Sequence, residues 1–138
     1  MFEKIINSKS IFSVGLSNSK EVDNDGIVIA TKNSMKKSLD KINYDYALID
    51  SVDLMINKPY FNFNKADSIS VSVAAASIIA KVCRDSIMSN IYDKLYPDYF
   101  FKNNKGYGSN KHIEIMKNIG LCPIHRKTFK PNSELIRK

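Results

Sequence analysis

A short and continuous apolar run, Tyr46–Ile49, is the feature that most constrains the fold of this chain. It lies between two longer stretches, residues 27–42 and about 70–95, whose apolar residues recur at helical spacing. A run without polar alternation predicts a strand that is buried on both faces, as in a sheet covered by helices. A looser alternation over residues 11–16 predicts a second strand. Helices between apolar strands indicate an α/β fold.

The C-terminal part of the chain shows weaker local signals. Gly106-Tyr107-Gly108 predicts a turn, and a short helix is expected from about residue 110 to 119, ended by Gly120. The tail from Cys122 onward has no clear pattern. No repeat or linker divides the 138 residues.

We therefore expect a single domain over residues 1–138, with an α/β core over 1–100 and a basic C-terminal region over 101–138. The net charge of +7 comes entirely from the second region. Residues 1–100 carry equal numbers of acidic and basic side chains. Residues 101–138 carry two acidic side chains against nine basic ones: Lys102, Lys105, Lys111, Lys117, Arg126, Lys127, Lys130, Arg137 and Lys138. Such a segment is typical of a polyanion-binding surface, although a solvated tail explains the charge equally well.

Neither membrane insertion nor secretion is expected. No apolar run approaches about 18 residues, the length a spanning helix needs. The N-terminus, MFEKIINSKSIFSVGLS, lacks the pattern of a signal peptide. Two cysteines, Cys83 and Cys122, without a secretion signal suggest a reducing compartment, so we predict a cytoplasmic protein without a disulfide.

Two aspartates are candidates for chemistry. Asp50 directly follows the apolar run, where packing gives no reason for a carboxylate and where open α/β sheets place their sites. A turn or helix-cap aspartate explains this position equally well. Asp67 precedes the 70–95 helix, where it is as easily explained as a partner of the helix N-terminus. Together they could hold a hard divalent cation through oxygen ligands. Asp53 is interpreted as a turn residue.

The histidines carry little signal. His112 lies on the expected short helix and is interpreted as a surface residue. Cys122 and His125 have a spacing that could hold zinc, but no second pair matches it. The turn Lys105-Gly106-Tyr107-Gly108 is more informative, because flanking glycines let a backbone approach a ligand and present the ring. A tyrosine there could contact a ribose 2′-hydroxyl, or it could simply cover a turn.

Three motifs together resemble ribonuclease HII. They are KADSISVSVAAASIIAKVCRDSIM, then KGYG before a helix, and then CPIHRKTF. Upstream, the segment ending in YALID is similar to the strand, helix and strand of that family. The resemblance runs from about residue 2 to 131, with the motifs in the order that the family shows.

The resemblance implies a ribonuclease H-like α/β fold, with a mixed central sheet flanked by helices and a helical C-terminal region. It implies an endonuclease that cuts the RNA strand of RNA–DNA hybrids, including ribonucleotides embedded in DNA, by two-metal-ion hydrolysis with Mn²⁺ or Mg²⁺. Asp50 and Asp67 match the third and fourth of four metal-binding carboxylates. Tyr107 matches the tyrosine that senses the 2′-hydroxyl, with Lys105 and Gly106 beside it in the substrate-binding turn.

The resemblance also has departures. The D-E-A-G-R-G-P motif, which carries the family's first two carboxylates, has no counterpart here, so we expect the family's N-terminal strands to be missing. Ser51 stands where a glycine is usual. The expected partners are an RNA–DNA duplex and a complementing N-terminal fragment, with the chain otherwise monomeric. The alternative is an inactive nucleic-acid-binding fragment, or one piece of a split enzyme.

Overall fold

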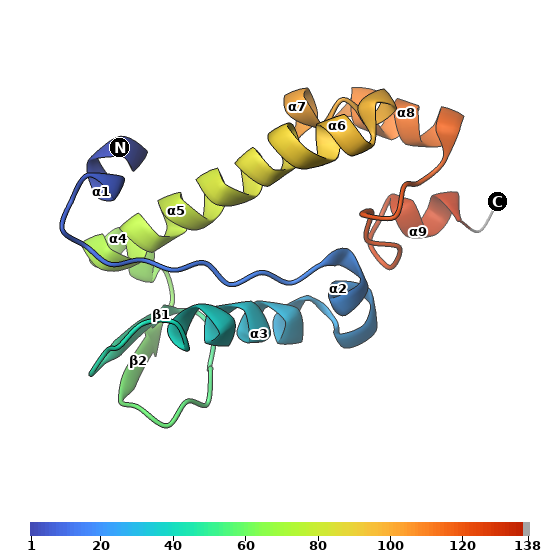
Figure 1. Ribbon diagram of the computed structural model, residues 1–138. Coiled ribbons are helices and arrows are strands. Elements are labelled where there is room, and N and C mark those ends of the chain that lie inside the picture. The colour runs from blue at the N-terminus through green and yellow to red at the C-terminus, as the bar shows by residue number, and fades with distance from the viewer. Residues whose placement is uncertain (137–138) are drawn as a thin grey trace. The chain divides into compact units, whose positions relative to one another are not determined.

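The computed structural model describes residues 1–136, so two of the basic residues counted above, Arg137 and Lys138, lie outside it. The described chain forms two compact units, each with its own apolar core (Figure 1). The first unit contains residues 1–17 and 28–83. The second contains residues 18–27 and the chain from Arg84 onward. Among residues 1–136, no helix is long and apolar enough to cross a membrane.

The first unit contains a parallel pair of strands, so the α/β prediction is confirmed. Strand β1 (Ala47–Asp50) pairs with β2 (Tyr60–Phe63) in a register that places Ala47 opposite Tyr60. Ala47 and Ile49 are buried against Leu54, whereas Leu48 between them is 41% exposed. The strand itself is therefore confirmed. The expectation that both of its faces are buried is wrong, because the core of this unit packs against one face.

Residues 11–16 do not form the predicted strand. They run as an extended segment along helix α3 (Ile27–Leu39), as Figure 1 shows. Two lysines of the helical region donate to carbonyls of the segment: Lys37 Nζ lies 3.0 Å from Leu16 O, and Lys41 Nζ lies 3.2 Å from Val14 O. A Cβ on Gly15 would lie 1.8 Å from Ser34 O of the helix. Backbone carbonyls of the segment are therefore hydrogen-bonded by side chains of the α3 region rather than by a neighbouring strand.

The long helical stretch is confirmed, but it is not one regular helix. Short helices α1 (Phe2–Ile6) and α4 (Ala66–Ile69) also belong to the first unit. After a break at Ser70, α5 (Val71–Ile87) continues into a wider π-helical turn, η1 (Met88–Tyr92), and then α6 (Asp93–Leu95). Such π-turns are often found at functional sites.

The second unit is built from short helices. Besides η1 and α6, it contains α2 (Ser19–Asp25), η2 (Pro97–Tyr99), α7 (Phe101–Asn104), α8 (Asn110–Ile119) and α9 (Asn132–Leu135). Helix α8 ends at Gly120, whose φ of 83° suits glycine, as predicted. The core consists of Tyr99, Phe101, Met116 and Cys122.

Helix α2 holds the basic loop that follows α8. The Asp23 carboxylate accepts hydrogen bonds from the backbone N–H groups of Lys127 (2.8 Å) and Thr128 (3.0 Å), and from the Thr128 hydroxyl (2.7 Å). Burial raises the pKa of Asp23, but the hydrogen bonds from Thr128 and Lys127 outweigh it, so that the pKa lies below its ordinary value. Asp23 thus fixes the backbone of the loop from a position about 100 residues earlier.

A buried pair of histidines corrects the interpretation of His112 as a surface residue. His112 is 1% exposed, and its Nε2 lies 3.2 Å from Nε2 of His125, which is also buried. His125 Nδ1 accepts from the backbone N–H of Cys122 at 3.0 Å. His125 therefore packs as a neutral imidazole. Burial, followed by the proximity of His112, lowers its pKa to about 4.

This low pKa predicts a loss of stability in mild acid. An unfolded histidine takes up a proton near pH 6.5, whereas folded His125 does so only near pH 4, so the unfolded state binds more protons between these values. We expect the free energy of unfolding to fall as the pH drops from 6.5 to 4, by up to about 1.4 kcal/mol per pH unit for this residue. Urea denaturation at a series of pH values measures the slope. His125→Gln should flatten it, and a flat profile for the unmutated protein would contradict the prediction.

Candidate active site

Asp50 is the last residue of β1, at the carboxyl end of a parallel strand. Its Oδ1 accepts from the backbone N–H of Ala66 at 3.1 Å and from the Ser51 hydroxyl at 2.9 Å. The Ala66 bond is the main reason why the pKa of Asp50 lies below its ordinary value. Asp50 is therefore an ionised and oriented carboxylate at neutral pH.

Asp67 directly follows the residue that donates to Asp50. It is exposed and occupies the first turn of α4, directly after the buried Ala66. Lys65 enters the helix with a left-handed backbone, φ 58°, which turns the chain at this point. Asp50 is thus hydrogen-bonded to the residue that precedes Asp67, at the junction between the strand end and α4.

Ser51 departs from the glycine that is usual in the resembled family, and its backbone shows why glycine suits the position. Its φ is 59°, in the left-handed region that side chains other than glycine adopt at a cost. The Ser51 hydroxyl donates to Asp50 at 2.9 Å. The serine therefore adds a hydrogen bond to the candidate site at a backbone position that glycine would occupy without strain.

The donor chemistry of this site fits a hard divalent cation, because both side chains offer carboxylate oxygens. Their number is small. Among residues 1–136, no group of three or more His, Cys, Asp or Glu side chains is placed to hold a metal ion. Asp53, the third aspartate of this region, accepts from the Tyr60 hydroxyl instead, in keeping with its interpretation as a structural loop residue. Asp50 and Asp67 therefore offer only part of the oxygen ligands that a hard divalent cation would need.

The turn that contains Tyr107 belongs to the second unit, whereas Asp50 and Asp67 belong to the first. Lys105 and Gly106 are both left-handed, with φ of 52° and 72°. The turn is closed by Asn104, whose carbonyl accepts from Tyr107 N at 2.8 Å and whose side-chain oxygen accepts from Gly106 N at 2.7 Å. The Tyr107 side chain is half exposed. The turn thus presents an aromatic ring on a fixed backbone.

Residues from the end of α5 and the π-turn hold this turn in place. The Arg84 guanidinium lies over the Tyr107 ring, 4.5 Å from its centroid. Met88 Cε lies 3.0 Å from where a Gly106 Cβ would be, and the Lys105 ammonium donates to Ser89. Sequence reasoning missed Arg84, Met88 and Ser89 as parts of the site. For Arg84 and Met88 the available signal was their spacing of four positions, which places them on one side of a helix.

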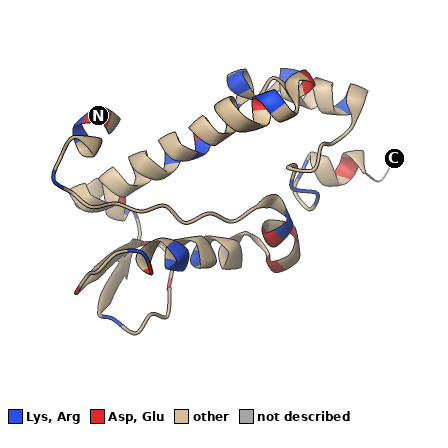
Figure 2. Ribbon diagram, viewed as in Figure 1, with Lys and Arg blue, Asp and Glu red and all other residues tan. Residues whose placement is uncertain are grey.

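The described part of the basic C-terminal region, residues 101–136, lies in the second unit. Figure 2 shows Lys and Arg along α7, α8 and the loop that follows them. Lys102, Lys111 and Lys117 are exposed on the helices, and Arg126 and Lys127 are exposed on the loop held by Asp23. Lys130 pairs with Glu134 at 2.9 Å, and both side chains are largely exposed. An exposed pair of this kind contributes little to stability.

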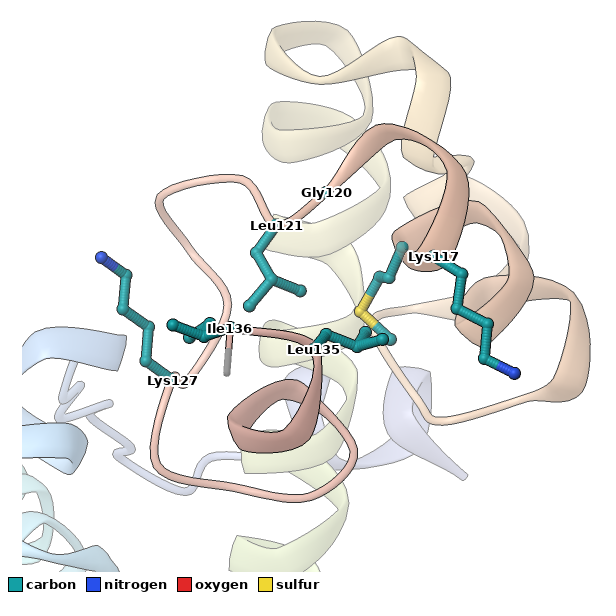
Figure 3. Close-up of a pocket in the computed structure, with 7 residues that line it drawn as sticks. Lys117, Gly120, Leu121, Lys127, Leu135 and Ile136 are labelled. Atoms are coloured by element: carbon teal, nitrogen blue, oxygen red, sulfur yellow. The ribbon is translucent and has the colours of Figure 1, made fainter. Parts of the chain in front are cut away.

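A hollow of about 560 Å³ lies in the second unit, away from the predicted site residues. Its lining is mainly apolar, with the side chains of Leu121, Leu135 and Ile136 and one lysine at each side, Lys117 and Lys127 (Figure 3). None of the residues that line it is Tyr107, Lys105 or Gly106.

With Asp50 at the carboxyl end of a parallel strand, the chain is of the broad α/β class whose sites lie at this edge of the sheet. Comparison with known proteins identifies one family within this class. The family model for ribonuclease HII matches residues 2–132. The chain belongs to the ribonuclease HII family.

Several bacterial relatives named ribonuclease HII are similar to nearly the whole chain. The protein from Enterococcus faecalis is 41% identical over 138 residues, which cover 99% of this chain and 54% of the relative. The protein from Acholeplasma laidlawii is 40% identical over 140 residues, covering 100% and 68%. The protein from Clostridioides difficile is 42% identical over 135 residues, covering 96% and 52%. The chain thus spans about half to two-thirds of the length of these relatives.

Proposed function

We propose that this chain contributes to an endonuclease that cleaves the RNA strand of RNA–DNA hybrids, including ribonucleotides embedded in DNA. The observation that carries the proposal is the Asp50 carboxylate at the carboxyl end of β1, hydrogen-bonded to the residue that precedes Asp67, in a chain of the ribonuclease HII family. In this proposal, residues 1–138 act as one domain of ribonuclease H-like fold, with a mixed central sheet to which a second polypeptide adds strands. The location we propose is the cytoplasm, with the chain otherwise monomeric.

Asp50 and Asp67 would hold Mn²⁺ or Mg²⁺ in this enzyme. A bound cation would supply Lewis-acid stabilisation of the phosphate at the cleavage site. The protein's own contribution is to keep Asp50 ionised and oriented, because the hydrogen bonds from Ala66 N and Ser51 Oγ favour its charged form. Asp67 is exposed on the first turn of α4, from which it can complete the coordination.

Substrate recognition is proposed for the turn of Lys105, Gly106 and Tyr107. The half-exposed Tyr107 ring would contact the sugar at the RNA–DNA junction, and its hydroxyl can bond a ribose 2′-hydroxyl. Gly106, at φ 72° and without a side chain, lets the backbone fold closely against Met88. Lys105 donates to Ser89 and to the Lys102 carbonyl, so its charge is held between the π-turn and α7.

A nicking assay on a duplex with one embedded ribonucleotide tests the proposed activity. The family's four carboxylates have two counterparts here, so we expect the purified chain alone to cleave weakly or not at all with Mn²⁺ or Mg²⁺. Adding the N-terminal segment of a ribonuclease HII relative, which carries the D-E-A-G-R-G-P motif, should restore cleavage. Robust metal-dependent nicking by the chain alone would contradict the expectation that the N-terminal segment must supply two of the four carboxylates.

A second candidate is an inactive nucleic-acid-binding fragment, and the small number of paired carboxylates favours it. The two proposals share the basic surface but differ in the nicking assay. If the complementing segment associates with the chain and no cleavage follows, the inactive fragment is the better description.

Duplex binding should depend steeply on salt in either case. Neutralised phosphates release counterions, so the logarithm of the affinity falls with the logarithm of salt by roughly 0.9 per phosphate contacted on B-form DNA. Lys127 is exposed on a loop whose backbone Asp23 fixes, so Lys127→Ala should flatten the slope by about one. Titration of a fluorescent duplex at several salt concentrations measures this. Lys4→Ala, which removes an exposed lysine of α1 instead, is the control, and salt-independent binding would contradict the prediction.

A further inference from the structure

We propose that Arg84 is a positioning residue for Tyr107, an inference that rests on the proposed role of that ring in reading the ribonucleotide. Arg84 lies near the end of α5, 23 positions before the tyrosine, and its guanidinium covers the ring at 4.5 Å from the centroid. A planar cation over an aromatic face is attracted by the electron density of the ring. Arg84 therefore holds one face of Tyr107, while half of the tyrosine side chain remains accessible to a sugar.

The guanidinium is itself fixed from two sides. Its Nη1 lies 3.1 Å from Asp85 Oδ1, in a pair whose side chains are 41% and 24% exposed. Its Nη2 lies 3.6 Å from where a Cβ on Gly106 would be, which is ordinary contact distance, so the guanidinium also lies beside Gly106. Asp85, on the same helix, sets the orientation of the guanidinium plane. The ring of Tyr107 thus rests on a plane that the helix positions rather than on a freely rotating side chain.

Arginine is suited to this task in a way that lysine is not. The guanidinium is flat and can stack on the ring while it donates to a carboxylate, whereas an ammonium is a compact point charge on a flexible stem. Arg84→Lys therefore keeps the charge of the position and removes the stacked plane. A loss of about 0.5–1 kcal/mol from the stack corresponds to a two- to five-fold change in the population of the held ring.

The experiment compares Arg84→Lys with Arg126→Lys in the full chain. Arg126 provides a matched control because its guanidinium also stacks on an aromatic ring, 4.1 Å from the centroid of Phe129, away from Tyr107. Each protein is titrated with two duplexes of equal length, one with a single embedded ribonucleotide and one of DNA alone. We expect Arg84→Lys to reduce the ratio of the two affinities by about two- to five-fold with the salt slope unchanged. Arg126→Lys should leave the ratio unchanged, whatever it does to both affinities.

A second measurement follows the ring without any ligand. The chain is labelled with fluorotyrosine, and the Tyr107 ¹⁹F resonance is identified by its loss in Tyr107→Phe. Arg84→Lys should shift this resonance, and Arg126→Lys should not. Circular dichroism confirms that each variant is folded.

The outcomes separate the inference from the proposed function. An unmutated chain that binds the two duplexes equally removes the proposed reading role of Tyr107, and the inference with it, before any variant is compared. An unmutated chain that prefers the ribonucleotide, combined with an unchanged ratio in Arg84→Lys, overturns the inference alone. A variant that loses affinity for both duplexes equally, with a flatter salt slope, shows instead that Arg84 contacts a phosphate.

Discussion

Asp50→Asn is expected to abolish ribonucleotide-directed nicking by the reconstituted enzyme while leaving the fold intact. Asparagine has nearly the same shape and keeps an oxygen that can accept from Ala66 N, so the junction between β1 and α4 should persist. It loses the negative charge that a hard cation requires. Since changes around metal ligands already cost 10–100-fold, we expect a loss of at least about 100-fold for this residue.

The measurement is single-turnover nicking by the chain with its complementing segment, together with urea denaturation of each variant. Asp53→Asn is the matched control. Asp53 is three residues away and exposed, but its carboxylate accepts from the Tyr60 hydroxyl and is not assigned to the metal. It should keep activity within a few-fold of the unmutated protein. Activity of Asp50→Asn at the same level as this control would show that the site is misplaced.

Phe101→Ala should cause the largest loss of stability in the second unit. The Phe101 side chain is 1% exposed, and its ring stacks on Tyr99 at 5.6 Å between centroids and contacts His112 at 5.5 Å. Replacing a buried phenylalanine by alanine loses its transfer free energy and leaves a cavity, which together cost about 3–5 kcal/mol. Urea denaturation followed by circular dichroism measures the change.

Phe100→Ala provides the comparison from the adjacent position. Phe100 is 48% exposed, and its ring contacts the Lys111 ammonium at 5.4 Å on the surface. An exposed contact of this kind is worth about 0.5–1 kcal/mol, so this variant should lose no more than that. Similar losses for the two variants would contradict the core as described.

Phe101 also links the core to the substrate-binding turn. Its Cε1 would lie 3.9 Å from a Cβ on Gly106, so the Phe101 ring packs beside the turn. Met88 and Arg84, from the helical segment, lie beside the same glycine. Any residual duplex binding by folded Phe101→Ala should therefore show a weaker preference for the ribonucleotide. The buried core and the proposed recognition turn are in this sense one structure.

The sequence by itself determined the features that depend on neighbouring residues. The apolar run that ends at Asp50 predicted β1, because four consecutive apolar side chains with a charge behind them suit the end of a buried strand. Helical spacing predicted α3 and α8, and Gly120 fixed the end of α8 because its backbone is left-handed there. The motifs around Asp67 and Tyr107 identified the family, and the family model confirmed it.

The tertiary structure decided what depends on residues far apart in the chain. Residues 11–16 have the alternation of a strand, but Lys37 and Lys41 of the α3 region take their carbonyls, and only the packed helix reveals this. No residue near His112 in the sequence indicates that its side chain is buried. Its partner is His125, brought to 3.2 Å by the folding of the loop after α8.

The same reason separates the candidate metal-binding residue from the candidate recognition turn. Asp50 could be proposed from its place at a strand end, because the apolar run before it predicts that strand. Arg84 could not be connected to Tyr107, because local spacing carries no information about two residues 23 positions apart. After α5 the helix continues through a π-turn, and the chain then folds back toward Arg84. Two left-handed residues, Lys105 and Gly106, make the turn that brings Tyr107 against the guanidinium.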